Sequence, residues 1–174
     1  VQYNKQGLQF SNSNLGIAAF GTGGAVQITI TAPKDPLERP LSTPQTIGQT
    51  PLYFSLLFKW QVASGERFGF AVYSSSSSSS RGDQVSASFG VYNSDGNREF
   101  FARVGSPDSY VQNVGGEPAV DNTYLMIGAL TKFNNDVTLE LWVVDDQTTS
   151  WSNAIHLTAQ SVSYTHLRAH ETPE

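Results

Sequence analysis

Two residues of this chain that could do chemistry, Glu140 and Trp142, lie in the segment 137–143, where polar and apolar side chains alternate. In a β-strand, alternate residues share one face, so Glu140 and Trp142 are predicted to point away from the apolar set. A carboxylate beside an indole suits sugar binding, because a pyranose ring presents C–H groups on its faces and hydroxyls at its edges. Packing is the simpler interpretation of Trp142, and an exposed structural glutamate is the simpler interpretation of Glu140.

Glu140 is also a candidate catalytic acid. A retaining glycosidase needs two carboxyl groups roughly 5 Å apart, and on a strand these come from alternate residues. The residues two positions before and after Glu140 are Thr138 and Trp142, so the sequence supplies no second carboxylate there. We therefore predict no catalytic residue.

Other aromatic residues could add to a sugar site. The candidates are Tyr73 and Tyr92, at the ends of two predicted strands, and Trp151, which lies after the last predicted strand. Aromatic side chains with a polar tip suit partly wet surfaces. We expect a ligand site to draw on these residues together with Glu140 and Trp142.

Two pairs of oxygen donors lie in predicted loops, and calcium prefers such ligands. They are Asp121-Asn122 and Asp145-Asp146. Asn and Asp also stabilise turns by bonding their own backbone, which is the simpler interpretation. The sequence thus makes calcium an optional ligand and predicts no required cofactor.

His166 and His170 are four residues apart and precede Glu171, a spacing that could place two zinc ligands on one helical face. The segment 162–172, however, resembles one reading frame of a transposon-based sequencing adapter, residue for residue. We therefore predict a domain over 1–161 and a non-native tail over 162–174, without a metal site. Arg81-Gly82-Asp83 resembles an adhesion motif but is interpreted as the charged end of a serine run.

The composition excludes several classes of partner. Charged residues make up only 14% of the chain and the net charge is −5, with no basic cluster for nucleic acid. No apolar run reaches the ~20 residues that a membrane span requires. The absence of Cys excludes disulfides and thiolate chemistry. A surface rich in Ser, Thr, Asn and Gln favours an extracellular protein.

A period of two runs through most of the chain and predicts about eight short strands, which is typical of a sandwich or jelly roll. The predicted strands are 7–10, 24–31, 52–60, 67–73, 84–92, 99–104, 123–133 and 137–143. Asp95-Gly96 predicts a hairpin between two of them. The prolines of 31–49 predict a surface crossover, and the serines of 74–80 predict a loop.

The strands 51–60 and 67–73, with the pair 123–133 and 136–143, resemble the concanavalin A-like, LamG-like jelly-roll proteins. The resemblance implies a two-sheet antiparallel β-sandwich. Such proteins continue into a closing strand, which we expect to be missing here at the C-terminal side, leaving a sheet edge open. The superfold hosts lectins, glucanases and adhesion modules.

Together these features predict a non-catalytic binding or surface-interaction module of an exported microbial protein, with a polysaccharide or cell-surface glycan as its ligand. Two alternatives stay open. One is a glycoside hydrolase of the same superfold, and the other is a purely structural or adhesion module.

Overall fold

The computed structural model describes residues 2–4, 8–20, 25–27, 45–59, 67–73, 85–94, 97–105, 111–134 and 136–161. Predictions made for Trp60, for most of the proline-rich segment, for 74–83 and for 162–174 lie outside these residues. Within the described part, the chain forms strands and two short 3-10 helices. The elements in chain order are β1 (Gln2–Asn4), β2 (Phe10–Asn12), η1 (Ser13–Leu15), β3 (Ile17–Phe20), β4 (Ala25–Gln27), β5 (Leu52–Lys59), β6 (Arg67–Tyr73), β7 (Val85–Ser94), β8 (Asn97–Val104), β9 (Val111–Gly115), β10 (Thr123–Phe133), β11 (Asp136–Val144), η2 (Trp151–Asn153) and β12 (Ile155–Gln160).

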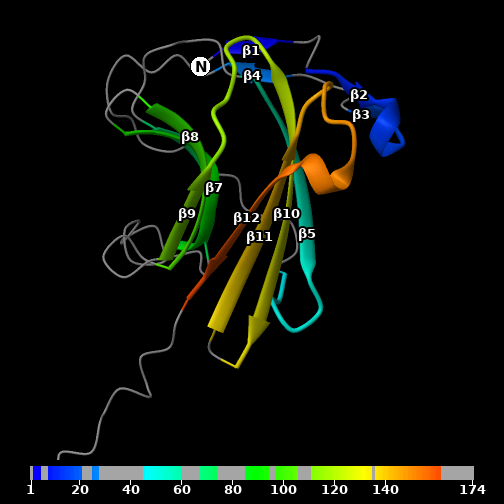
Figure 1. Cartoon of the computed structure of the whole chain (residues 1–174). Helices are drawn as coiled ribbons and strands as arrows, with labels where there is room; N and C mark the ends of the chain where they lie inside the picture. The colour runs from blue at the N-terminus through cyan, green and yellow to red at the C-terminus, as the bar shows by residue number, and fades with distance from the viewer. Residues whose placement is uncertain are drawn as a thin grey trace, which may run out of the picture.

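Two four-stranded antiparallel sheets face each other (Figure 1). The first sheet has the order β12-β11-β10-β5 and the second has the order β6-β7-β8-β9. Two smaller pairs, β1-β4 and β2-β3, complete the described strands. The predicted all-β sandwich is therefore confirmed, whereas its assignment as a jelly roll stays a prediction.

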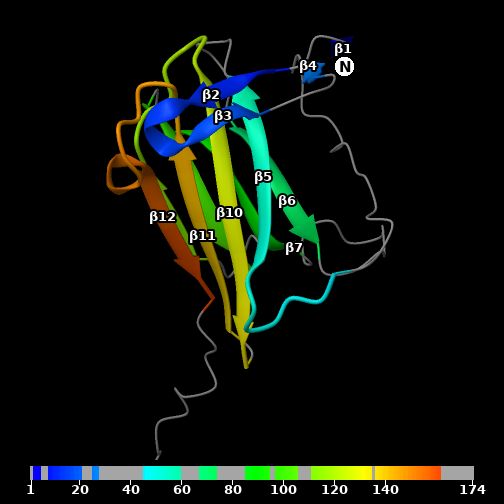
Figure 2. The ribbon, with the colours of Figure 1, turned by 90° about the vertical axis from the view of Figure 1, so that its right-hand side faces the viewer.

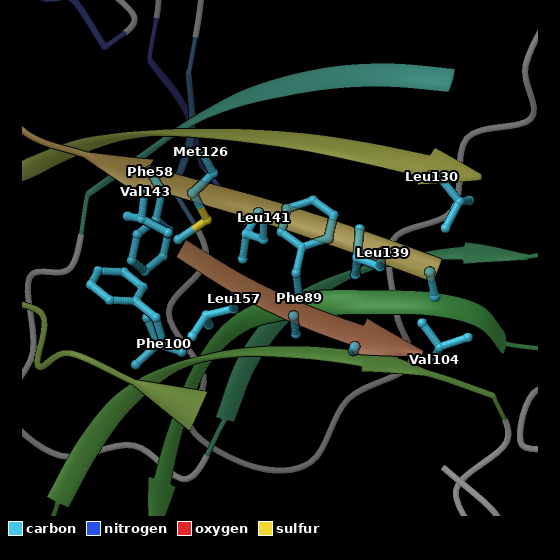
Figure 3. Packing of buried hydrophobic residues seen from close by; sticks show 14 of the residues in the cluster. Phe58, Phe89, Phe100, Val104, Met126, Leu130, Leu139, Leu141, Val143 and Leu157 are labelled. Carbon is cyan, nitrogen blue, oxygen red and sulfur yellow. The ribbon is translucent and has the colours of Figure 1, made fainter. Parts of the chain in front are cut away.

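The core fills the space between the two sheets (Figure 3). Leu139, Leu141 and Val143 project into it from β11 and are almost completely buried, while Phe89 and Phe100 meet them from the second sheet. Burying one such side chain stabilises the fold by about 1.5–3 kcal/mol relative to leaving it exposed. The residues between them on β11 must therefore point outward, as the alternation predicted.

The sheets come closest where edge strand β12 meets the end of β9. A Cβ added at Gly115 would be 3.1 Å from Cδ2 of Leu157, and one added at Gly116 would be 2.5 Å from Cδ1 of Ile155. Gly116 also has a φ of +68°, in the left-handed region that favours glycine. Two adjacent glycines thus let β12 pack against this end of the second sheet.

The hairpin of β2 and β3 crosses one end of the first sheet on its outer side (Figure 2). Phe10 packs there with Leu125 and Val144 in a second, smaller apolar cluster. Asn12 is buried and its Nδ2 donates to the backbone oxygens of Asp145 (2.8 Å) and Thr148 (2.9 Å). This side chain therefore ties the hairpin to the loop that follows β11.

Most strand predictions are confirmed. The predicted strands 67–73 and 123–133 match β6 and β10 at both ends, and 52–60, 84–92, 99–104 and 137–143 correspond to β5, β7, β8 and β11 with ends shifted by one or two residues. Ser94 lies opposite Asn97, as expected for the Asp95-Gly96 hairpin. The predicted strand 7–10 is largely wrong, because residues 8 and 9 form no strand and only Phe10 belongs to β2. Residues 25–27 of the predicted strand 24–31 form β4, and the rest of that prediction lies outside the described residues. Strands β1, β3, β9 and β12 were not predicted.

Candidate functional site

The outer surface of the first sheet is open below the β2–β3 hairpin, where Figure 2 shows no described element in front of the strands. Strand alternation and the pairing register define the residues that project from it. We call this surface the open face. It consists of Tyr53 and Ser55 (β5), Ala129 and Thr131 (β10), Thr138, Glu140 and Trp142 (β11), and His156, Thr158 and Gln160 (β12). Phe133 and Asp136, which pair beside the β10–β11 turn, project on the same side at the far end of this face.

Trp142 and His156 form the aromatic centre of the open face. They lie directly opposite each other on β11 and β12, and their rings stack with centroids 4.7 Å apart and planes 5° from parallel. Glu140 is their neighbour, with its Oε1 3.9 Å from Nε2 of His156. The side chains of Glu140 and His156 are 44% and 43% exposed, so a ligand could reach both.

Tyr53 stands on the far side of the open face. It lies opposite Ala129, which in turn lies opposite Glu140, so the three residues form one row across the sheet. Because neighbouring strands are about 4.8 Å apart, Tyr53 and Glu140 project from points roughly 10 Å apart. Tyr53 is 67% exposed. Aromatic groups therefore lie on two sides of the open face, Tyr53 on β5 and the pair of Trp142 and His156 on β11 and β12. Hydrogen-bonding side chains lie on the strands between them, at Thr131, Thr138 and Glu140.

Glu140 has no carboxylate among its neighbours in the sheet. It lies opposite Ala129 on β10 and Thr158 on β12, and Thr138 and Trp142 flank it along β11. A retaining glycosidase would need a second carboxyl group roughly 5 Å away. The neighbours of Glu140 offer threonine hydroxyls and an aromatic ring instead. Such groups can bind a sugar, but none of them can act as the second carboxylate.

The other aromatic candidates lie away from the open face. Tyr92 is in β7, and its alternation with buried Phe89 and Val91 places it on the outer side of the second sheet. Tyr73 ends β6 in the same sheet, and its side chain lies outside the described residues. Trp151 is 45% exposed in η2, in the connection between β11 and β12. Only Trp142 and Glu140 of the predicted ligand residues are thus brought together.

The calcium candidates carry structural contacts. Asp121 occupies a turn with a φ of +69°, and its Oδ1 is 3.7 Å from Nζ of Lys59. Oδ1 of Asp145 accepts hydrogen bonds from the backbone N–H of Gln147 (3.1 Å) and from Oγ1 of Thr148 (2.8 Å).

Asn122 is half-buried and Asp146 is exposed beside these turns. Among the described residues, no three His, Cys, Asp or Glu side chains gather in a way that could hold a metal ion. Calcium binding stays a prediction.

His156 and Tyr53 were not among the predicted site residues. The signal for His156 was present, because Ile155, Leu157 and Ala159 alternate with polar residues in 155–160. Its contact with Trp142 depends on the register between β11 and β12, which no local pattern gives. Tyr53 belongs to a strand that was predicted, on the side opposite its apolar set.

None of the described helices is long and apolar enough to cross a membrane. A scan against protein-family models gave no match to this chain, and searches of curated proteins and of solved structures gave none either.

Proposed function

We propose that this domain is a non-catalytic carbohydrate-binding module that holds a polysaccharide or cell-surface glycan on its open face. The observation that carries the proposal is the stacked pair of Trp142 and His156 on an exposed sheet surface, with the Glu140 carboxylate beside it. Aromatic groups can contact the C–H faces of sugar rings, while carboxylate and hydroxyl groups bond the sugar hydroxyls.

The surroundings of the aromatic pair support the same proposal. Thr158 and Gln160 are exposed on β12, and Ser55 is exposed near Tyr53 on β5. Hydroxyl and amide groups can both donate and accept hydrogen bonds, which matches the dual character of a sugar hydroxyl. A sheet holds these groups on a rigid support, so little conformational entropy is lost when a ligand binds.

A binding role is favoured over hydrolysis because Glu140 lacks a partner carboxylate in the sheet. The low charge of the chain supports export from a microbial cell. We place the domain, as part of this proposal, among the concanavalin A-like, LamG-like sandwiches.

The test is to measure dissociation constants of the purified domain for a panel of neutral, acidic and amino-sugar polysaccharides, with and without calcium. We expect the wild type to bind at least one of them, and Trp142→Ala to weaken that binding at least about tenfold, the size of a binding hot spot. Circular dichroism would verify that the variant keeps its fold.

Trp151→Ala is the matched control, because Trp151 is an exposed tryptophan outside the open face. Its binding should equal that of the wild type. If no polysaccharide binds, the proposal is wrong. Release of reducing sugar that Glu140→Gln abolishes would identify a glycoside hydrolase instead.

A further inference from the structure

The open face has an unusual distribution of charge. Between residues 123 and 161, which form three of the four strands of the first sheet, the sequence has one Lys and no Arg. The same segment contains four carboxylates, at Asp136, Glu140, Asp145 and Asp146. Glu140 is the one that projects from the middle of the open face.

Neither lysine of the first sheet offers its charge to the open face. Lys132 alternates with Thr131, so the strand directs it to the opposite side of β10. Lys59 does share the outer side of β5, but it lies at the end covered by the β2–β3 hairpin and pairs with Asp121 at 3.7 Å. Among the described residues, the open face therefore offers a ligand the Glu140 carboxylate and the His156 imidazole but no lysine or arginine.

From this distribution we infer that the open face selects uncharged polysaccharides and excludes polyanionic ones, and that Glu140 sets this selectivity. The inference rests on the proposed function. A polyanion binds where cationic side chains replace its counterions, and its uronate or sulfate groups would instead approach the Glu140 carboxylate. A neutral chain can donate its hydroxyls to the same carboxylate in charge-assisted hydrogen bonds.

His156 does not reverse this selectivity. Its Nε2 is 3.9 Å from Oε1 of Glu140, so a protonated imidazole would at most neutralise the nearby carboxylate. The other outward-facing neighbours of His156 on β11 and β12 are Trp142, directly opposite, and Thr158, two residues along the strand, and neither carries charge. The pair has no net positive charge to offer a polyanion.

The experiment compares a neutral β-glucan with a polyuronate of similar chain length, at one pH and at low and high salt. The wild type should bind the β-glucan and not the polyuronate. Glu140→Gln should weaken β-glucan binding about tenfold, because a charge-assisted bond becomes a neutral one. Glu140→Lys should gain polyuronate binding at low salt and lose it at high salt, since exposed charges are screened.

Asp146→Lys is the matched control, because it makes the same change of charge at an exposed residue outside the open face. It should not gain polyuronate binding. An equal gain in Asp146→Lys would show an effect of net charge and overturn the role of Glu140. Binding of polyuronate by the wild type as tightly as β-glucan, or tighter binding of a cationic amino-sugar chain, would overturn the selectivity while leaving the proposed function intact. Failure of the wild type to bind any polysaccharide of the full panel would overturn both.

Discussion

The ring of Phe54 lies against the backbone of Gly128, its partner across β5 and β10. A Cβ at Gly128 would collide with Cζ and Cε2 of that ring. The same ring stacks on Phe89 of the second sheet, with centroids 4.9 Å apart and planes at 22°. The missing side chain of Gly128 therefore makes room for an aromatic contact that joins the two sheets.

Gly128→Ala should destabilise the domain by about 2 kcal/mol, because the added methyl group displaces a ring that is packed against Phe89. Chemical denaturation would measure the change in the free energy of unfolding. Gly48→Ala is the control, since a Cβ there meets no atom within 4 Å. Its effect should stay within about 0.5 kcal/mol. Equal effects at the two glycines would contradict the role given to Phe54.

Gly116→Ala should cost more stability than Gly16→Ala. Both glycines have left-handed φ angles, +68° and +73°, so both substitutions carry a backbone cost of about 1 kcal/mol. A Cβ at Gly16 meets nothing within 4 Å, whereas one at Gly116 meets Ile155. We expect about 1 kcal/mol more at Gly116.

Ile155→Val, which removes Cδ1, provides the check on this difference in a double-mutant cycle with Gly116→Ala. The extra cost of the alanine should become smaller in the Ile155→Val background, because the 2.5 Å contact is lost and the nearest remaining atom is Cγ1, at 3.1 Å. An unchanged cost would mean that the contact between β12 and the end of β9 is not its cause.

Asn12→Ala should lower the free energy of unfolding by about 2–3 kcal/mol. The substitution removes two donated hydrogen bonds, to the backbone oxygens of Asp145 and Thr148, and leaves those groups without this partner. It also removes Oδ1, which accepts from the backbone N–H of Leu15 at 3.2 Å. Asn14→Ala, at an exposed position of η1, should change stability by less than about 0.5 kcal/mol in the same thermal or urea experiment.

Tyr53→Ala should weaken polysaccharide binding about tenfold while leaving stability almost unchanged, because the side chain is 67% exposed on the open face. Phe133→Ala removes an aromatic ring of similar exposure, 61%, at the end of β10. Calorimetric titration of both variants with the same polysaccharide would separate the two positions. A larger loss of affinity in Phe133→Ala than in Tyr53→Ala would show that the polysaccharide binds near the β10–β11 turn instead.

How far the sequence predicts the fold differs from strand to strand. Strand β10 was predicted with both ends, since its eleven residues are bounded by Asn122 and Asn134, which favour turns. Strand β9 was missed because Gln112 and Asn113 interrupt its apolar pattern and it is an edge strand. Strand β12 alternates, but it has only six residues and small Ala159 at one of its three apolar positions.

In the site, too, the contacts within one strand could be predicted from the sequence, whereas the contacts between strands could not. Glu140 and Trp142 were placed on one face because the alternation of a single strand is local. The stacking of Trp142 on His156 required the register of β12 against β11, which depends on the intervening loop 145–154. Contacts from Asn12, more than 130 positions earlier in the chain, help to hold that loop. No short-range pattern contains this information.

Strand β11 alternates between Leu139, Leu141 and Val143 in the core and Thr138, Glu140 and Trp142 on the outer surface. Mutations in the outer set leave the packing between the sheets untouched. Natural variation could therefore change what the surface recognises without first restoring a damaged core. The same separation makes the first sheet a scaffold on which new specificities could be selected from a library confined to alternate positions.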